Sequence, residues 1–517
     1  MAKLALRTVL ATALATCALT SGCGKVAMPG ANAASGSDAA AQAAKHKARG
    51  GGTPAWVKDA VFYQIFPERF ANGDKGNDPT KTQAWGGKPE NENFFGGDLA
   101  GVEQKLPYIK SLGVNAIYFN PIFKSSSNHK YNTSDYMQID PHFGTNAQFK
   151  ALVAKCHAQG IKVIIDGVFN HTGDDHVWFQ DAKQNGQKSK YWNYYSIYGY
   201  PVVTDPKPNY DAWWGFGTLP KMRVADNPDV QKNIYEVVDY WTSQGVDGWR
   251  LDVPNEIASD SFWQGFRQHV RAINPNAYIV GEIWTDGSHW VQGDQFDAVM
   301  NYLYREQVLN FFAYQNSSVD DLDARLGDLR RKYGDDVTQA EFNILGSHDV
   351  PRVLTESGGN VARMKEAVFF QMVSPGAPVV YYGDELGMTG AKDPDNRRCF
   401  PWEKTRGNDM LAFYQKMIGL REAHPALRGA EFTTLMRHND FRLFAFVRGN
   451  GKERVVVALN SGHSPRDLSL DVGQTFKDGT AVVDYVSGKR FTVQGGKLAI
   501  PGLVPQTGMV LGAAGSR

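Results

Sequence analysis

The fold is decided by two stretches of sequence, IKVIIDGVFNH (161–171) and GWRLD (248–252). Each begins as a run of apolar and β-branched residues and ends in polar or charged ones. A strand that is buried on both faces of a parallel sheet has this composition. The polar end of each run would then project from the carboxyl edge of that sheet. Six more runs of the same type complete the set of predicted strands, at 61–66, 115–120, 278–283, 298–302, 342–348 and 378–383.

Amphipathic stretches separate these runs and predict helices at 102–112, 147–159, 230–243, 261–273 and 362–372. Gly113, Gly160 and Gly245 follow three of them, as C-terminal caps do. Eight alternating strand and helix units predict an α/β protein with a closed (β/α)8 TIM barrel over residues 55–428. An open doubly wound sheet uses the same alternation. However, it gives no reason for eight units, and no Gly-rich phosphate loop follows the first strand.

Two further modules are expected. The third unit is interrupted at 172–225 by a stretch rich in Trp, Tyr, Asn and Gly, which predicts a small domain inserted after the third strand. From residue 429 to 517 strand-like runs alternate with turns and no helical pattern appears. This predicts a C-terminal antiparallel β-sandwich.

The first residues are typical of an export signal. Lys3 and Arg7 precede a short apolar run at 9–19, and TSGC (20–23) resembles a bacterial lipobox. We therefore predict a lipoprotein signal peptide at 1–23 and a disordered tether at 24–54. The protein is expected to be exported and anchored by a lipid at Cys23, in the periplasm or at the cell surface. A soluble secreted form is the alternative.

The composition excludes some partners. The chain has 55 Lys and Arg against 54 Asp and Glu, so no net field favours nucleic acid or an anionic membrane surface. Aromatic residues make up 12% of the chain, and many lie in polar loops, where they either pack or stack on sugars. Outside the export segment only Cys156 and Cys399 remain, and they either form a disulfide or stay as buried thiols.

Catalytic groups of a (β/α)8 barrel lie at the carboxyl ends of its strands. The predicted strand ends carry eight polar residues, which are Asp166, Asn170, His171, Arg250, Asp252, Glu282, His348 and Asp349. Carboxylates from separate strands, with no His or Cys cluster, indicate cleavage of a glycosidic bond. That reaction needs one carboxylate and one carboxylic acid with opposed roles.

These segments resemble, in order, the short conserved regions of the α-amylase family of glycoside hydrolases, and YYGDE (381–385) adds another. The resemblance covers about residues 56–510. NHKY (128–131), DPHFG (140–144), VPNE (253–256) and DPDNRR (393–398) are similar to the neopullulanase, cyclomaltodextrinase and maltogenic amylase group. That group carries an N-terminal dimerisation domain, which is not found before Trp56, so a monomer is expected.

The resemblance implies a retaining hydrolase of α-1,4-glucosidic bonds in maltodextrins, starch, cyclodextrins or pullulan. Asp252 would be the nucleophile, Glu282 the general acid and base, and Asp349 the group that stabilises the transition state. Arg250 lies two residues before Asp252 on the same strand face and would keep it ionised. The sugar would be contacted by the remaining predicted residues, which are Tyr131 as a stacking platform, His171, His348, Asp393 and Arg397. Trp284 would either stack on the leaving sugar or pack in the core.

A second group consists of oxygen-bearing or turn-forming residues, namely Asn72, Asp74, Asn77, Asp78, Gly96 and Asp98. Closely spaced carboxylate and amide oxygens suit Ca²⁺, although Asn, Asp and Gly also build ordinary turns. The resemblance favours a structural Ca²⁺.

Two alternatives to the hydrolase stay open. A glucan transglycosylase of the same fold would share all these motifs. A non-catalytic glucan-binding lipoprotein would be expected to lack one of the three carboxylates, and all three are present.

Overall fold

A computed structural model describes residues 52–449, 451 and 453–515. Its centre is an eight-stranded parallel sheet in the order β8-β7-β6-β5-β2-β1-β10-β9. A parallel bridge between Met300 and Phe342 joins the two ends, so the sheet closes into a barrel. All eight predicted strands are present in the predicted order. Their bounds are β1 (Phe62–Ile65), β2 (Ala116–Phe119), β5 (Lys162–Gly167), β6 (Gly248–Leu251), β7 (Tyr278–Gly281), β8 (Ala298–Val299), β9 (Phe342–Ile344) and β10 (Ala377–Tyr381).

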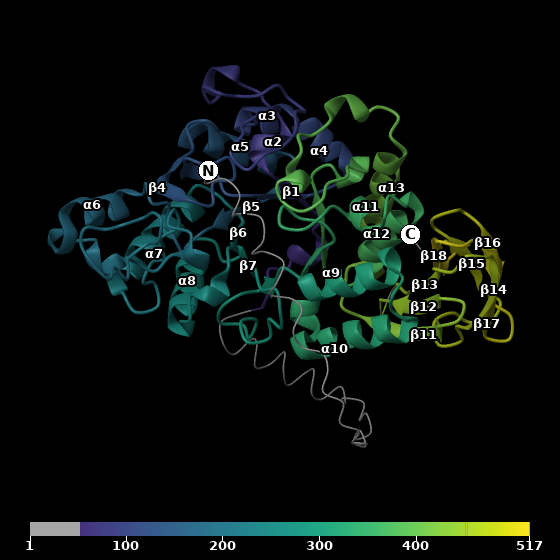
Figure 1. The fold of residues 1–517 in the computed structure, drawn as a ribbon. Coiled ribbons are helices and arrows are strands. Elements are labelled where there is room, and N and C mark those ends of the chain that lie inside the picture. The colour runs from purple at the N-terminus through teal and green to yellow at the C-terminus, as the bar shows by residue number, and fades with distance from the viewer. Residues whose placement is uncertain (1–51, 450, 452, 516–517) are drawn as a thin grey trace, which may run out of the picture.

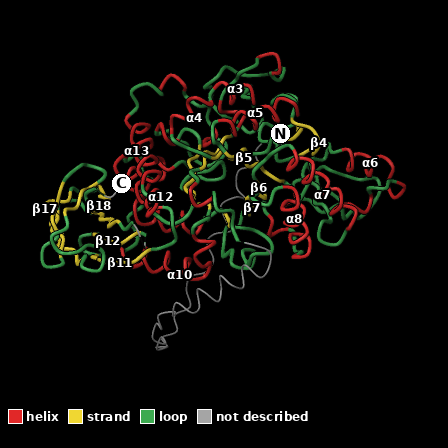
Figure 2. The backbone as a smooth tube through the Cα atoms, turned by 180° about the vertical axis from the view of Figure 1, so that it is seen from behind, coloured by secondary structure: helices red, strands yellow, loops and turns green. Residues whose placement is uncertain are grey.

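Helices surround this barrel, which occupies the middle of the molecule (Figures 1 and 2). Their apolar residues are buried against the strands, and together they form one large hydrophobic core. Helices are found in all the predicted ranges, and α5, α7, α8 and α12 each begin after a capping side chain, such as Asn227 before α7. The longer helices of the barrel are α5 (Asn146–Ala158), α7 (Pro228–Ser243), α8 (Asp260–Ile273), α10 (Val319–Thr338), α12 (Val361–Val373) and α13 (Asp409–Ala423); the shorter ones are α2 (Pro67–Phe70), α3 (Leu99–Gln104), α4 (Leu106–Leu112), α9 (Tyr302–Val308) and α11 (Val353–Glu356).

Two of the differences from the predicted bounds have clear local reasons. The helix predicted at 102–112 is two helices, because Pro107, the second residue of α4, lacks the N–H that would continue the first helix. The strand predicted at 298–302 is only two residues long. Asn301 caps α9 there, so the chain turns into a helix at Tyr302.

The segment between β5 and α7 forms the predicted insertion. It holds α6 (Val177–Asn185), short 3-10 turns and isolated antiparallel bridges, and it extends to one side of the barrel (Figure 1). Its end returns to the barrel rim, where Met222 N–H donates to the Asn170 carbonyl and Thr172 N–H to the Pro220 carbonyl. A separate hairpin, β3 (Phe123–Ser125) with β4 (Thr133–Ile139), follows β2.

The C-terminal part is antiparallel, as predicted, and lies on the other side of the barrel (Figure 1). Two sheets enclose an apolar core of their own. Helix α12 packs against β18, which joins this part to the barrel. One sheet contains β11 (Phe432–His438), β12 (Leu443–Arg448), β13 (Val455–Asn460), β15 (Ala481–Asp484), β16 (Arg490–Thr492) and β18 (Thr507–Ala513), and the other pairs β14 (Arg466–Asp471) with β17 (Lys497–Leu503).

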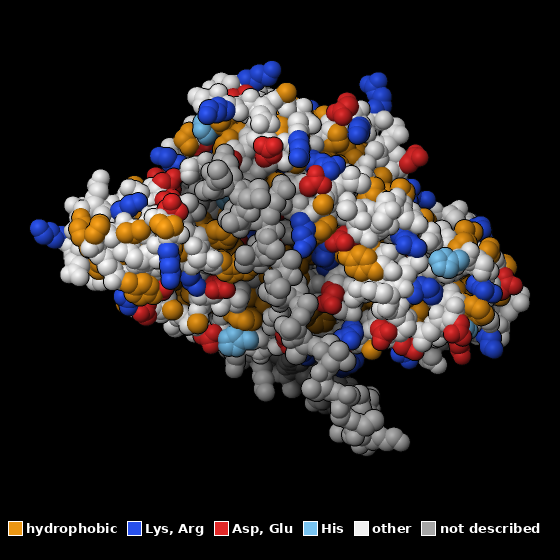
Figure 3. Space-filling view, viewed as in Figure 1, with side chains coloured by type: hydrophobic (Ala, Val, Ile, Leu, Met, Phe, Trp, Pro, Cys, Tyr) orange, Lys and Arg blue, Asp and Glu red, His pale blue; other side chains and the backbone are white. Residues whose placement is uncertain are grey.

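The predicted signal peptide, Cys23 and nearly all of the predicted tether lie outside the described residues. Among the residues that are described, no helix is long and apolar enough to cross a membrane. Cys156 and Cys399 are both buried and free, so the two thiols do not form a disulfide. The exact domain limits stay predictions. On the face shown in Figure 3, acidic and basic side chains are interspersed, in keeping with the balanced composition.

Candidate active site

One buried guanidinium joins three of the predicted carboxylates. Arg250 on β6 and Asp166 on β5 are paired in register, and Asp252 follows Arg250 by two residues on the same strand face. Arg250 Nη1 donates to Asp166 Oδ1 and to Asp252 Oδ1, at 2.9 Å in both cases. Its Nη2 lies 3.0 Å from Oε2 of Glu282, the residue after β7, in an ion pair without hydrogen-bond alignment. The structure therefore brings Asp252 and Glu282 together on one cation.

Asp166 is the structural member of this group. It is fully buried, and Tyr118 and Tyr131 both donate to its Oδ2, at 2.6 and 3.0 Å. Burial raises the pKa of Asp166, while Arg250 and the two phenols oppose that rise. With both of its oxygens occupied by protein donors, Asp166 is placed to fix Arg250 and not to meet a substrate.

Burial likewise raises the pKa of Asp252, and Arg250 opposes the rise. The next residue, Val253, has φ 35° and ψ 50°, a left-handed conformation that a β-branched residue rarely adopts. This backbone directs Val253 N–H to Glu282 Oε2 at 3.0 Å, and Trp284 Nε1 donates to Glu282 Oε1 at 3.1 Å. The strained turn thus orients the predicted acid beside the predicted nucleophile, as strained backbone often does at functional sites.

His348 and Asp349 follow β9 and face the same group. Gln64 Nε2 is 2.9 Å from His348 Nδ1, so Nδ1 is the acceptor and the ring proton lies on Nε2. Nε2 is 2.5 Å from the Tyr131 hydroxyl and 3.2 Å from Asp349 Oδ2. Burial and the nearby arginines lower the pKa of His348 well below its usual range, which keeps the ring neutral and able to donate one hydrogen bond.

Arg397 connects the remaining polar residues. Its Nη1 lies 3.1 Å from Asp393 Oδ1 and its Nη2 3.7 Å from Asp349 Oδ1. Its Nε donates to the His348 carbonyl at 3.0 Å. The predicted pair Asp393 and Arg397 is therefore formed and lies next to Asp349.

His171 lies at the border between barrel and insertion. Its Nε2 is 3.1 Å from the Tyr131 carbonyl, and its ring stacks on Trp213 with centroids 5.2 Å apart. Burial lowers the pKa of His171 to about 4, so this ring is also neutral near pH 7. The hydroxyl of Tyr131 is used to hold Asp166 and His348, a role that the sequence did not indicate.

Several contributors were missed in the sequence. Gln64 and Tyr118 are polar residues inside otherwise apolar strands, and this pattern could have singled them out. Trp284 stacks on Tyr302 at 3.7 Å and is still 46% exposed, so it packs on one face and remains open to a ligand on the rest. Neither Tyr302 nor Trp213 has a sequence signal, because each contact joins residues from distant elements.

Four of the six predicted Ca²⁺ residues form two contacting pairs. Asn72 Nδ2 donates to Asp78 Oδ1 at 2.7 Å, and Asn77 Nδ2 to Asp98 Oδ2 at 3.1 Å. The buried Oδ1 atoms of Asn72 and Asn77 have no hydrogen-bond partner. Buried, unpartnered amide oxygens beside carboxylates fit a hard cation. In the described residues no three or more His, Cys, Asp or Glu side chains form a metal cluster, so the amides would be essential.

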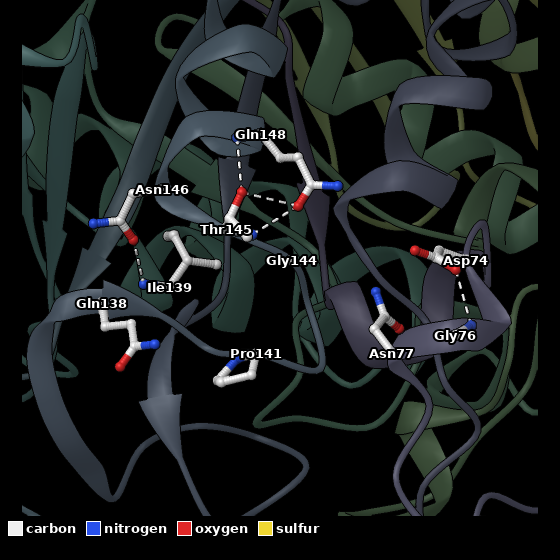
Figure 4. A pocket seen from close by; sticks show the side chains of 10 residues that line it. All are labelled: Asp74, Gly76, Asn77, Gln138, Ile139, Pro141, Gly144, Thr145, Asn146 and Gln148. Carbon is white, nitrogen blue, oxygen red and sulfur yellow. Dashed lines mark hydrogen bonds between the residues drawn. The ribbon is translucent and has the colours of Figure 1, made fainter.

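Asp74 contacts this group through its backbone, whose N–H donates to Asp98 Oδ2 at 2.9 Å, and its side chain lies outside the two pairs. It is exposed, and its Oδ1 accepts from Gly76 N–H at 2.8 Å (Figure 4). It lines a surface pocket of about 630 Å³ between this loop and the start of α5, as Asn77 and Gln148 also do. Gly96 fits the set, because a Cβ there would lie 2.2 Å from Asp78 Oδ1.

Two family models match the chain. Residues 64–410 match the catalytic domain of α-amylase, and residues 437–510 match the neopullulanase-like C-terminal domain. The first match alone covers more than half of the chain.

Individual proteins agree with these matches. A cyclomaltodextrinase of Thermoanaerobacter pseudethanolicus is 48% identical over 424 residues, which are 81% of this chain and 73% of that protein. Neopullulanase 2 of Thermoactinomyces vulgaris is 44% identical over 463 residues, 89% and 78% of the two chains. A solved structure of the cyclic α-maltosyl-(1→6)-maltose hydrolase from Arthrobacter globiformis, in complex with that sugar, has a TM-score of 0.81 at 37% identity. It covers 90% of this chain and 100% of its own.

The electrostatics of Asp349 predict a pH effect on stability. Burial, followed by the charge of Glu282, raises the pKa of Asp349 from 3.8 to about 7, against Arg397 and Arg250. The stability from this group is complete below about pH 4 and is lost as the pH rises through about 7, because the folded state binds the proton more tightly. We expect Asp349→Asn to gain Tm relative to the unmodified protein as the pH rises from about 4 to about 7.5. Calorimetry across this pH range measures the difference, and a constant difference contradicts it.

Proposed function

Because this chain belongs to the α-amylase family, we propose that it hydrolyses α-1,4-glucosidic bonds of maltodextrins, starch, cyclodextrins or pullulan and retains the anomeric configuration. The observation that carries the proposal is the contact of Asp252 and Glu282 with the same Arg250 guanidinium. Two carboxyl groups that are both held at a barrel rim are the minimum that this reaction needs. The cyclic and branched sugars named for the relatives define the substrates to try first.

In the first step Asp252 attacks the anomeric carbon while Glu282 gives its proton to the departing glycosidic oxygen. A covalent glycosyl-enzyme forms and the shortened glucan leaves. In the second step Glu282 takes a proton from water, the water oxygen attacks the same carbon, and the bond to Asp252 breaks. Two inversions at one carbon give net retention.

The surrounding residues would act on charge and orientation. Arg250 favours the ionised form of Asp252, which is the nucleophilic form. Asp349, His348 and His171 would bind the hydroxyls of the reacting sugar. In the free enzyme both histidines are bonded to Tyr131 through Nε2, so each would exchange that partner for a sugar hydroxyl. Asp393 and Arg397, beside Asp349, would bind the next glucose towards the non-reducing end.

Asp252→Asn tests the nucleophile. The amide cannot form the glycosyl-enzyme, so turnover of maltoheptaose should fall below detection. Dextrin binding should persist, because the Asn side chain keeps the shape of the site. Steady-state assays and calorimetric titration measure the two quantities. Glu282→Gln should lower kcat by about 10²- to 10⁴-fold. Activity of Asp252→Asn near that of the unmodified enzyme would refute the assignment.

We also propose a structural Ca²⁺ held by the pairs Asn72 with Asp78 and Asn77 with Asp98. It would satisfy the unpartnered amide oxygens and brace the loop after β1, because Asp98 also accepts from the backbone N–H groups of Gly73 and Gly101. Asp74 and Gly96 would shape the loop around the ion. The ion would supply charge neutralisation and would take no part in bond cleavage.

Chelation tests this second proposal. Removal of Ca²⁺ should lower Tm and its return should restore it, because a ligand bound only by the folded state stabilises that state. Asp78→Asn should reduce this Ca²⁺-dependent shift, whereas Glu90→Gln, in an exposed position of the same region, should leave it unchanged. Equal Tm with and without Ca²⁺ would contradict the site.

We propose further that the protein is exported and held at a membrane by a lipid on Cys23, on the strength of the apolar run at 9–19 and the TSGC motif. The monomeric state stays a prediction. When the full chain is expressed in bacteria, Cys23→Ser should move the protein from the membrane pellet to the soluble fraction. Cys156→Ser is the matched control and should stay in the pellet. Equal partition of both variants contradicts a lipid anchor.

A further inference from the structure

The insertion presents an unusual pair of tryptophans next to the candidate active site. Trp213 and Trp214 belong to a 3-10 turn at Trp213–Gly215. Their rings stack with centroids 5.2 Å apart and planes 26° apart. Trp213 also stacks on His171, so the three rings form a column that leads from the barrel rim outwards. Trp214, at the outer end, is 73% exposed.

The backbone of this turn holds Trp214 in a costly conformation. Its φ of 51° and ψ of 21° are left-handed, which glycine tolerates and a bulky residue rarely adopts. The turn is fixed on both sides, because Trp213 N–H donates to the Leu219 carbonyl and Phe216 N–H to the Trp213 carbonyl. The strain is therefore imposed by the surrounding turn, and its result is a large aromatic ring presented to solvent.

Trp213 also lowers the stability of the folded state. Its indole Nε1 is buried and has no hydrogen-bond partner. An unpaired buried donor and a strained, exposed aromatic do not serve stability. Features that lower stability but persist next to a catalytic site are expected to serve binding, and exposed aromatic faces are the groups that stack on the apolar faces of pyranose rings.

We propose that Trp214, backed by Trp213, forms a platform for glucose units of the substrate that lie beyond those held at the carboxylates. The proposal rests on the proposed glucan hydrolysis and adds a selectivity for long or cyclic glucans over short ones. The occupant follows from where the column begins, because His171 bonds the carbonyl of Tyr131, whose hydroxyl holds Asp166 in the candidate active site. A glucan chain that is held at Asp252 and leaves the site on the side of His171 would pass Trp213 before it reaches Trp214.

Trp214→Gly tests the platform, since glycine adopts the left-handed backbone without strain. The KM for maltoheptaose should rise roughly 5- to 10-fold, the value of an aromatic stack, while kcat stays the same. The KM for maltotriose should change less than about twofold.

Glycine relieves the backbone strain but removes the packing of the indole on Trp213. These two effects oppose each other, so Tm should stay within about 3 °C. Tyr200→Ala, at an exposed aromatic near α6, is the matched control and should change neither KM.

Binding in an inactive background separates this inference from the proposed activity. In the Asp252→Asn background, the additional change Trp214→Gly should raise the Kd for maltoheptaose by the same roughly 5- to 10-fold factor that is expected for KM. Calorimetric titration measures this Kd. If the unmodified enzyme hydrolyses neither sugar, the proposed function fails while the titration still tests the platform. An unchanged Kd, or equal losses for maltoheptaose and maltotriose, would overturn the platform.

Discussion

The site depends on the Arg250 guanidinium, which is completely buried and contacts Asp166, Asp252 and Glu282. Three carboxylates at one barrel rim repel one another and lose their hydration, and a single cation cannot neutralise all of them. The fold compensates in two ways. Tyr118 and Tyr131 donate to Asp166, and the backbone of Val253 donates to Glu282. Asp252 keeps Arg250 as its principal partner, which leaves it the group most available to a substrate.

This constraint explains why the geometry is built on strands. Asp252 directly follows β6 on the same face as Arg250, and Asp166 on β5 pairs with Arg250, so two of the three contacts follow from strand geometry and sheet register. Sheet register alone does not orient the Glu282 side chain, because Glu282 lies beyond the end of β7. The left-handed turn at Val253 and the indole of Trp284 supply that orientation. Local strain appears again at Trp214, in the insertion.

Much of this arrangement could be predicted from sequence, and the reasons are physical. The eight strands are apolar runs with polar ends, and strand periodicity places Arg250 and Asp252 together. Contacts between distant elements could not be predicted, since nothing in the sequence pairs Gln64 with His348 or Trp284 with Tyr302. The strand predicted to reach residue 348 ends at Ile344, because the chain then turns, with a bridge between Ser347 and Val350. That turn brings Asp349 next to Arg397 and close enough to Glu282 for the two charges to interact.

The central claim is that Asp252 becomes covalently bonded to the sugar. The most direct measurement is mass spectrometry of the protein after incubation with 5-fluoro-α-maltosyl fluoride, which slows the second step, followed by peptide mapping. The account predicts a mass increase of one glycosyl unit that maps to Asp252, that is absent in Asp252→Asn, and that is lost on addition of maltotriose as acceptor. A glycosyl group on any other residue, or hydrolysis that inverts the anomeric configuration, would contradict it.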